Sequence, residues 1–173
     1  HWHIGGYFLM QNLIPAWLDW IRLLHSRNIS ISLDTNWDPS GNWENIWELL
    51  PWINVFLPNE AEAHAITGDK DLNGAGRKLA EKCTLVVIKT ADKGASVFQG
   101  TKRDDYSIPD ACLQGLRIKD TTGAGDNFDA GFIRCWLLKK PVSTCIEYAF
   151  SCAISSLKSM GGIEGQIVIK HIE

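Results

Sequence analysis

The sequence lacks the features that mark membrane-spanning, secreted and zinc-stabilised proteins. No apolar run approaches the roughly 18 residues that a transmembrane helix needs, and the start of the chain has no secretory signal. The cysteines are irregularly spaced, odd in number and contain no Cys-x-x-Cys pair. We therefore expect reduced thiols, a cytoplasmic location, no membrane partner and no structural zinc.

The sequence also lacks an excess of positive charge. Lys and Arg number 17 against 20 Asp and Glu, which gives a formal net charge of −3. Non-specific nucleic-acid binders need a Lys and Arg excess on one face, so we expect no nucleic-acid partner. A chain of 173 residues without a visible linker or repeat predicts a single domain over residues 1–173.

Strand and helix signals alternate along the chain. Short apolar runs predict strands, and apolar residues at helical spacing predict helices between them. The predicted strands cover residues 1–8, 29–33, 53–57, 85–88, 95–99, 103–108 and 116–119. The predicted helices cover residues 14–24, 43–50, 60–67, 72–83, 124–138 and 143–159. This alternation is typical of an α/β protein with a mostly parallel sheet, with an antiparallel hairpin at 95–108, covered by helices on both faces.

Two common phosphate-binding motifs are missing. The P-loop pattern does not occur, and Gly123-x-Gly125 lacks the third glycine of a dinucleotide fingerprint. Instead, the segment Asp120–Asp126 (DTTGAGD) places a glycine turn between a predicted strand and a predicted helix. Backbone N–H groups at the start of that helix would point outward at its positive end, which suits phosphate oxygens.

Asp126 stands in the first turn of this predicted helix, where the helix dipole favours the ionised carboxylate. A carboxylate beside a phosphate site repels the ligand, so it is better suited to accept a proton from an attacking hydroxyl. The alternative is that Asp126 is only a helix-start acid and that the glycines form only a tight turn.

The DTTGAGD segment, followed by Phe128 and Gly131, resembles the C-terminal signature of the ribokinase-like sugar kinases, the phosphofructokinase-B (PfkB) family. Three other segments resemble family motifs in the right order. These are the Asp-x-Asn at Asp34–Asn36, the Asn-x-x-Glu at Asn59–Glu62, and the nucleotide-site strand and loop at Val87–Ala95. The resemblance implies a three-layer α/β/α ribokinase-like fold that phosphorylates a sugar hydroxyl with ATP and Mg²⁺.

The resemblance also implies catalytic roles around the glycine turn. Asp126 would be the base that takes the proton from the sugar hydroxyl. The N–H groups of Gly123, Ala124 and Gly125 would form the anion hole for the γ-phosphoryl group.

The same resemblance implies residues for the nucleotide and for metal ions. Asn59 and Glu62 would organise Mg²⁺ through water beside the nucleotide, and Lys89 and Gly94 would border the nucleotide. Asp120 matches the position near which many relatives bind a monovalent cation such as K⁺. The alternatives are a simple helix cap for Asn59 and Glu62, and a solvated strand-end lysine for Lys89.

Three positions depart from the family pattern. Asp38 stands where many relatives have Arg, which reverses the charge and puts an anion contact there in doubt. Ala91 replaces a common Gly. Phe150 stands where many relatives have Asn near the adenine, which implies more apolar adenine contacts.

The N-terminal portion of the family, with its first strands and its lid, has no counterpart in this sequence. We therefore expect this chain to be the C-terminal, nucleotide-binding portion of a carbohydrate kinase and to be inactive by itself. We expect the full-length protein to form a homodimer. Two alternatives remain open: a nucleoside or vitamin kinase of the same superfamily, and a non-catalytic remnant of the fold.

Overall fold

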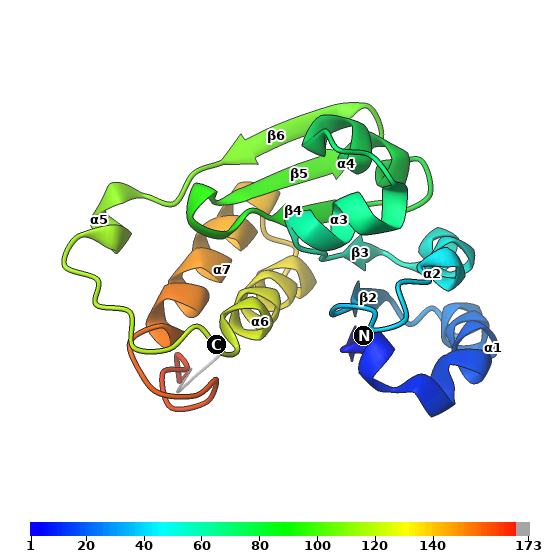
Figure 1. Cartoon of the computed structure of the whole chain (residues 1–173), viewed down its shortest axis with the longest axis horizontal. Coiled ribbons are helices and arrows are strands. Elements are labelled where there is room, and N and C mark those ends of the chain that lie inside the picture. The colour runs from blue at the N-terminus through cyan, green and yellow to red at the C-terminus, as the bar shows by residue number, and fades with distance from the viewer. Residues whose placement is uncertain (169–173) are drawn as a thin grey trace. The chain divides into compact units, whose positions relative to one another are not determined.

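The computed structural model describes residues 1–168, and these form two compact units (Figure 1). The first unit comprises residues 1–91 and 95–105, and the second comprises residues 92–94 and the chain from Tyr106 onward. The single domain over residues 1–173 stays a prediction.

A six-stranded sheet has its strands in the order of the sequence, from β1 to β6. The strands are β1 (Trp2–Gly5), β2 (Ile31–Asp34), β3 (Val55–Phe56), β4 (Val86–Lys89), β5 (Ala95–Gln99) and β6 (Lys102–Tyr106). Strands β1 to β4 are parallel, and β5 is antiparallel to β4. The mixed α/β sheet predicted from the alternation is confirmed.

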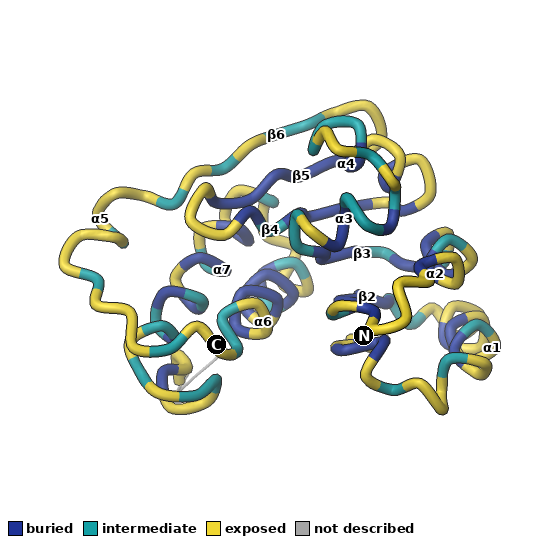
Figure 2. The backbone as a smooth tube through the Cα atoms, viewed as in Figure 1, coloured by how far each residue is buried: buried dark blue, intermediate teal, exposed yellow. Residues whose placement is uncertain are grey.

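The first unit also contains the helices that cover this sheet. They are α1 (Ile14–Ser26), α2 (Glu44–Leu49), α3 (Glu60–Thr67) and α4 (Leu72–Ala80). Helix α1 packs against β2, α3 against β4, and α4 against β4 and β5. Buried positions, drawn dark blue in Figure 2, concentrate along β2, β3 and β4, because a sheet covered by helices removes both sides of its strands from water.

The second unit is helical. It contains α5 (Asp110–Leu113), α6 (Ala124–Leu137) and α7 (Val142–Ser156). Helices α6 and α7 pack closely at Gly131, where an added Cβ would lie 2.9 Å from Cys152 Sγ and 3.0 Å from Ala149 Cα. Only glycine permits this close approach between the middle of α6 and α7.

The predicted strand at residues 116–119 is wrong. None of these residues is in a strand, and the Ile118 side chain is 60% exposed. The Lys119 N–H donates instead to the carbonyl oxygen of Leu157, just after α7. Alternation of apolar and basic residues suggested a strand, but a strand also requires a neighbour to pair with, and this segment pairs with the end of a helix.

The first predicted strand, at residues 1–8, ends earlier than expected. Strand β1 stops at Gly5, and Gly6 adopts a left-handed conformation with φ of 70°. A short 3₁₀ helix then covers Tyr7–Leu9 and a second covers Gln11–Leu13. The left-handed turn redirects the chain away from the sheet and toward α1.

Candidate functional site

The first candidate site is a cluster at the carboxyl ends of β2, β3 and β4, which we call the strand-end cluster. It consists of Asp34, Asn59, Glu62 and Lys89. Lys89 Nζ lies 2.9 Å from Asp34 Oδ2, and the two side chains are only 13% and 9% exposed. The ion pair joins the ends of β2 and β4, between which β3 lies. The alternative of a solvated strand-end lysine is therefore wrong.

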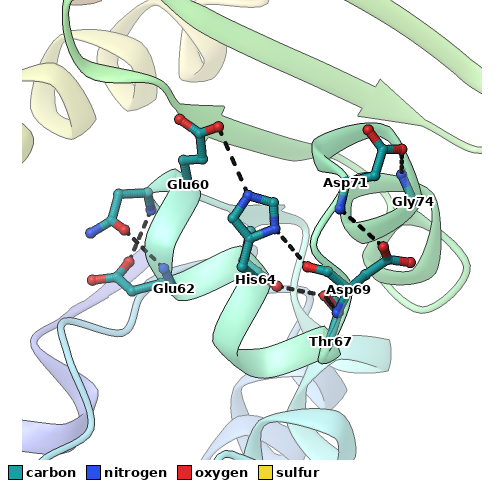
Figure 3. Close-up of polar contacts among 9 residues, drawn as sticks. Glu60, Glu62, His64, Thr67, Asp69, Asp71 and Gly74 are labelled. Atoms are coloured by element: carbon teal, nitrogen blue, oxygen red, sulfur yellow. Dashed lines mark hydrogen bonds and ion pairs between the residues drawn. The ribbon is translucent and has the colours of Figure 1, made fainter.

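Asn59 and Glu62 form a reciprocal cap at the start of α3. The Glu62 N–H donates to Asn59 Oδ1 at 2.9 Å, and the Asn59 N–H donates to Glu62 Oε2 at 2.9 Å. Figure 3 shows Glu62 in this first turn of α3. The cap satisfies helix donors that would otherwise lack partners, so these residues have a structural role whatever else they bind.

The environment of Glu62 differs from that of an ordinary capping residue. Its side chain is buried, with 4% exposure. Burial is the largest cause that raises the pKa of the Glu62 carboxyl, and the Asp34 charge raises it further. Hydrogen bonding to Asn59 and the charge of Lys89 oppose this shift. A buried carboxylate beside a second one favours a cation, because a cation stabilises the ionised form of both.

The strand-end cluster suits a hydrated Mg²⁺ better than a metal held by protein alone. Within residues 1–168, no group of three or more His, Cys, Asp or Glu side chains could hold a metal ion. Mg²⁺ usually keeps several waters and binds through one or two carboxylates together with substrate phosphates. Asp34 and Glu62 could supply these carboxylates. The sequence placed Asp34 in an Asp-x-Asn motif at the end of a buried strand but did not predict that it binds a metal or pairs with Lys89.

The second candidate site is the glycine turn of the second unit, at residues 120–126. Gly123 precedes α6 in a left-handed conformation with φ of 74°. An added Cβ there would lie 2.6 Å from Gly162 Cα. The Ala124 N–H donates to Thr121 O at 3.2 Å, so the N–H groups of Gly125 and Asp126 are better placed to receive an anion at the helix start.

Asp126 lies in the first turn of α6, and its side chain is exposed. Its neighbour Asn127 is buried, with 5% exposure. Asn127 Nδ2 donates to Gly123 O at 2.8 Å and to Gly162 O at 3.0 Å. The buried Asn127 side chain thus fixes the turn through hydrogen bonds, while the exposed Asp126 side chain remains accessible to a substrate hydroxyl.

Asp120 ties the start of the same turn to the segment after α7. Its Oδ1 accepts from the Thr122 N–H at 2.9 Å and from Thr122 Oγ1 at 2.8 Å, and its Oδ2 accepts from the Gly161 N–H at 2.8 Å. These hydrogen bonds, the Thr122 N–H first, lower the pKa of Asp120 to about 2. Asp120 is therefore an ionised anchor at neutral pH.

The loop after β4 requires unusual backbone angles at two positions. Ala91 has φ of 52°, a left-handed conformation that favours glycine. Gly94 has φ of 110°, and an added Cβ would collide with the Tyr106 carbonyl oxygen. Gly94 thus has a steric role that is separate from the predicted nucleotide contact.

Phe150 is a buried residue of the second unit. Its side chain is 4% exposed, and its ring centroid lies 5.8 Å from that of Phe128. A cavity of about 350 Å³ borders α7. Its lining includes Leu116, Ser151 and Ile154 but not Phe150.

The family model of the pfkB carbohydrate kinases matches residues 1–168. The chain belongs to the pfkB carbohydrate kinase family. The predicted membership is therefore confirmed. Within residues 1–168, no helix of this pfkB chain is long and apolar enough to cross a membrane.

Two curated pfkB relatives illustrate the similarity. The chain is 33% identical over 115 residues to the cytidine kinase of Thermococcus kodakarensis, covering 66% of this chain and 40% of the relative. It is 26% identical over 159 residues to the 2-dehydro-3-deoxygluconokinase of Haemophilus influenzae, covering 87% of this chain and 49% of the relative. The chain therefore spans half or less of the length of these relatives.

A solved structure shows the fold. The putative Ribokinase II from E. coli in complex with ATP and Mg²⁺ matches with a TM-score of 0.82 at 21% identity, covering 95% of this chain and 54% of that one. The predicted ribokinase-like α/β fold is confirmed by this likeness.

Proposed function

We propose that this chain is the nucleotide-binding and phosphate-binding portion of a kinase that transfers the γ-phosphoryl group of ATP to a hydroxyl of a small sugar or nucleoside. The observation that carries the proposal is the glycine turn. Gly123 and Asn127 hold the start of α6 so that backbone donors and the exposed Asp126 carboxylate lie together. That combination suits an attacking hydroxyl beside a phosphoryl group.

The chemical step divides between two groups of this turn. Asp126 accepts the proton of the acceptor hydroxyl while the hydroxyl oxygen attacks the γ-phosphorus of ATP. The bond between the γ-phosphorus and the oxygen that bridges it to the β-phosphate breaks, and ADP leaves. The N–H groups at the helix start stabilise the negative charge on the transferring group. Asn127 and Asp120 both fix this turn, which would keep its N–H groups and Asp126 in position for the reaction.

The strand-end cluster provides residues for Mg²⁺, with Glu62 and Asp34 as oxygen donors and Asn59 organising Glu62. When bound, Mg²⁺ would neutralise charge on the nucleotide phosphates. Lys89, held by Asp34, would keep a positive charge at the same strand ends.

The cavity beside α7 suits a nucleotide base. Leu116 and Ile154 provide apolar surface, and Ser151, Ser155 and Lys158 provide polar groups along one face of the helix. A base needs both kinds of contact, because its ring is apolar and its edges form hydrogen bonds. Phe150 would support this face from inside the unit.

The proposed function is tested by measuring acceptor-dependent ATP consumption by the full-length protein with a panel of sugars, nucleosides and vitamins bearing a free hydroxyl. Turnover with a sugar or nucleoside supports the proposal. Turnover only with a vitamin points to another branch of the superfamily, and no turnover with any acceptor favours the non-catalytic remnant.

The cytoplasmic location, the homodimer and the inactivity of the isolated chain stay predictions.

Glu62→Gln is expected to raise the Mg²⁺ concentration for half-maximal rate by about tenfold, because one negative oxygen donor is lost while the side-chain shape is kept. Mg²⁺ titration of activity measures this shift. Glu60→Gln is the matched control. Glu60 lies in the same helical turn, but its Oε1 lies 3.8 Å from His64 Nε2 and it is not part of the strand-end cluster. An unchanged Mg²⁺ titration in Glu62→Gln would show that the segment is only a helix cap.

Potassium is expected to raise the rate relative to Na⁺ or Tris at equal ionic strength, because the ionised Asp120 lies beside the glycine turn. Initial rates in the three chloride salts test this. Equal rates would remove the monovalent cation from the proposal and leave Asp120 as an anchor of the turn.

A further inference from the structure

The first unit contains a second cavity, of about 280 Å³, that the proposed chemistry does not use. We call it the Asp38 cavity. Its lining residues come from the segments that follow β1 and β2, which are Phe8, Gln11, Ile14, Pro15, Asp38, Ser40, Asn42 and Asn45. The carboxyl ends of parallel strands are where open α/β sheets bind their ligands. Its volume is close to the lower end of the roughly 300–1,000 Å³ of small-molecule sites, which suits one sugar ring.

The lining combines apolar surface with hydrogen-bonding groups. Phe8, Ile14 and Pro15 are apolar, whereas the exposed amides of Gln11, Asn42 and Asn45 can both donate and accept. A sugar presents the same two features, because its C–H faces are apolar and its hydroxyls donate and accept. Among the lining residues within the described part of the chain, none is Lys, Arg or His.

Among residues 1–168, the only charged residue that lines the cavity is Asp38, whose side chain is 3% exposed. Its Oδ1 accepts from the Ser40 N–H at 2.8 Å and from Ser40 Oγ at 2.8 Å. These bonds fix the carboxylate in the cavity wall. Burial first, and then the charges of Asp38 and Glu48, raise the pKa of Tyr7 to about 12.

We propose that the Asp38 cavity binds an uncharged, hydroxyl-rich part of the phosphoryl acceptor and excludes acceptors that carry a carboxylate or phosphate there. The inference rests on the proposed function and adds the substrate class. A fixed, nearly buried carboxylate repels an anion strongly, since water screens the two charges poorly at such a position. It can accept a hydrogen bond from a sugar hydroxyl.

Binding to this chain without ATP tests the inference independently of phosphoryl transfer. The probes are matched pairs: ribose with ribose 5-phosphate, glucose with glucuronate, and cytidine with cytidine monophosphate. Tryptophan fluorescence reports occupancy, because the Trp43 ring lies 5.0 Å from that of Phe8 in the cavity wall. We expect at least one neutral probe to bind tenfold or more tightly than its anionic partner. Equal affinities within every pair, or no binding of any neutral probe, would overturn the inference.

Asp38→Asn keeps the size of the side chain and an oxygen that accepts from Ser40 but removes the charge. We expect it to reduce the neutral-to-anionic preference at least fivefold, chiefly through tighter anion binding. Asp104→Asn on β6 makes the same charge change on a side chain outside the cavity and should leave the preference unchanged. An unchanged preference in Asp38→Asn would contradict the role of the carboxylate.

Gln11→Ala provides a second test that does not depend on whether Asp38→Asn folds. Gln11 is exposed, so its truncation should not disturb the fold. It should weaken neutral binding several-fold without changing the fluorescence of the free protein, and unchanged affinity would place the ligand elsewhere. Selective binding without any ATP turnover by the full-length protein would retain the cavity and reject the proposed kinase reaction.

Discussion

Asp126→Asn is expected to lower the turnover of the full-length protein by about 100-fold or more, which is the usual scale for loss of a general base. Nucleotide affinity should stay the same or rise slightly, because the substitution removes a negative charge beside the phosphate site. The measurements are steady-state rates with the best acceptor and nucleotide titration in its absence.

The matched control for this variant is Asp110→Asn. Asp110 is also an acid in the first turn of a helix, α5, so the two variants share any general effect of removing such a charge. If both retain near-normal turnover, Asp126 is only a helix-start acid and has no part in the mechanism.

Gly123→Ala is expected to damage both stability and binding. A left-handed residue other than glycine costs about 1–2 kcal/mol, and φ at Gly123 is 74°. The new Cβ would also lie 2.6 Å from Gly162 Cα, where backbone must move, and overpacking of this kind costs about 1–3 kcal/mol. Denaturant unfolding should therefore show a loss of about 2–5 kcal/mol, and nucleotide binding should weaken strongly.

Gly100→Ala separates the two causes. Gly100, in the turn between β5 and β6, has φ of 56°, but nothing lies within 4 Å of an added Cβ. This control should lose only the cost of the left-handed conformation, about 1–2 kcal/mol, and should bind nucleotide normally. Equal losses of stability in the two variants would show that the contact between Gly123 and Gly162 does not constrain the turn.

Features that depend on residues close together in the sequence could be predicted. The helix predicted over residues 60–67 is present, and Asn59 and Glu62 form at its start the cap that was the alternative to their predicted Mg²⁺ role. The DTTGAGD segment predicted a glycine turn before a helix, and Gly123 precedes α6 in the conformation that such a turn needs. Both follow from backbone geometry within a few residues.

The failed predictions concern features that depend on distant partners. Residues 116–119 alternate like a strand, yet Lys119 donates to Leu157 and the segment has no strand to pair with. The alternative of a solvated Lys89 was left open because Asp34, its partner, lies 55 positions away in the sequence; the predicted nucleotide contact of Lys89 stays a prediction. Periodicity describes a segment, but pairing depends on which segment lies beside it.

The sequence by itself thus determined the α/β alternation, the pfkB signature and the residues at the start of α3 and α6. Only the tertiary structure decided that Lys89 is paired, that Glu62 is buried beside a second carboxylate, and that Asp38 lines a cavity. The physical reason is that hydrogen-bonded turns and helix caps form between near neighbours in the chain. Burial and charge pairing, by contrast, arise only when the order of strands in a sheet brings distant residues to the same edge.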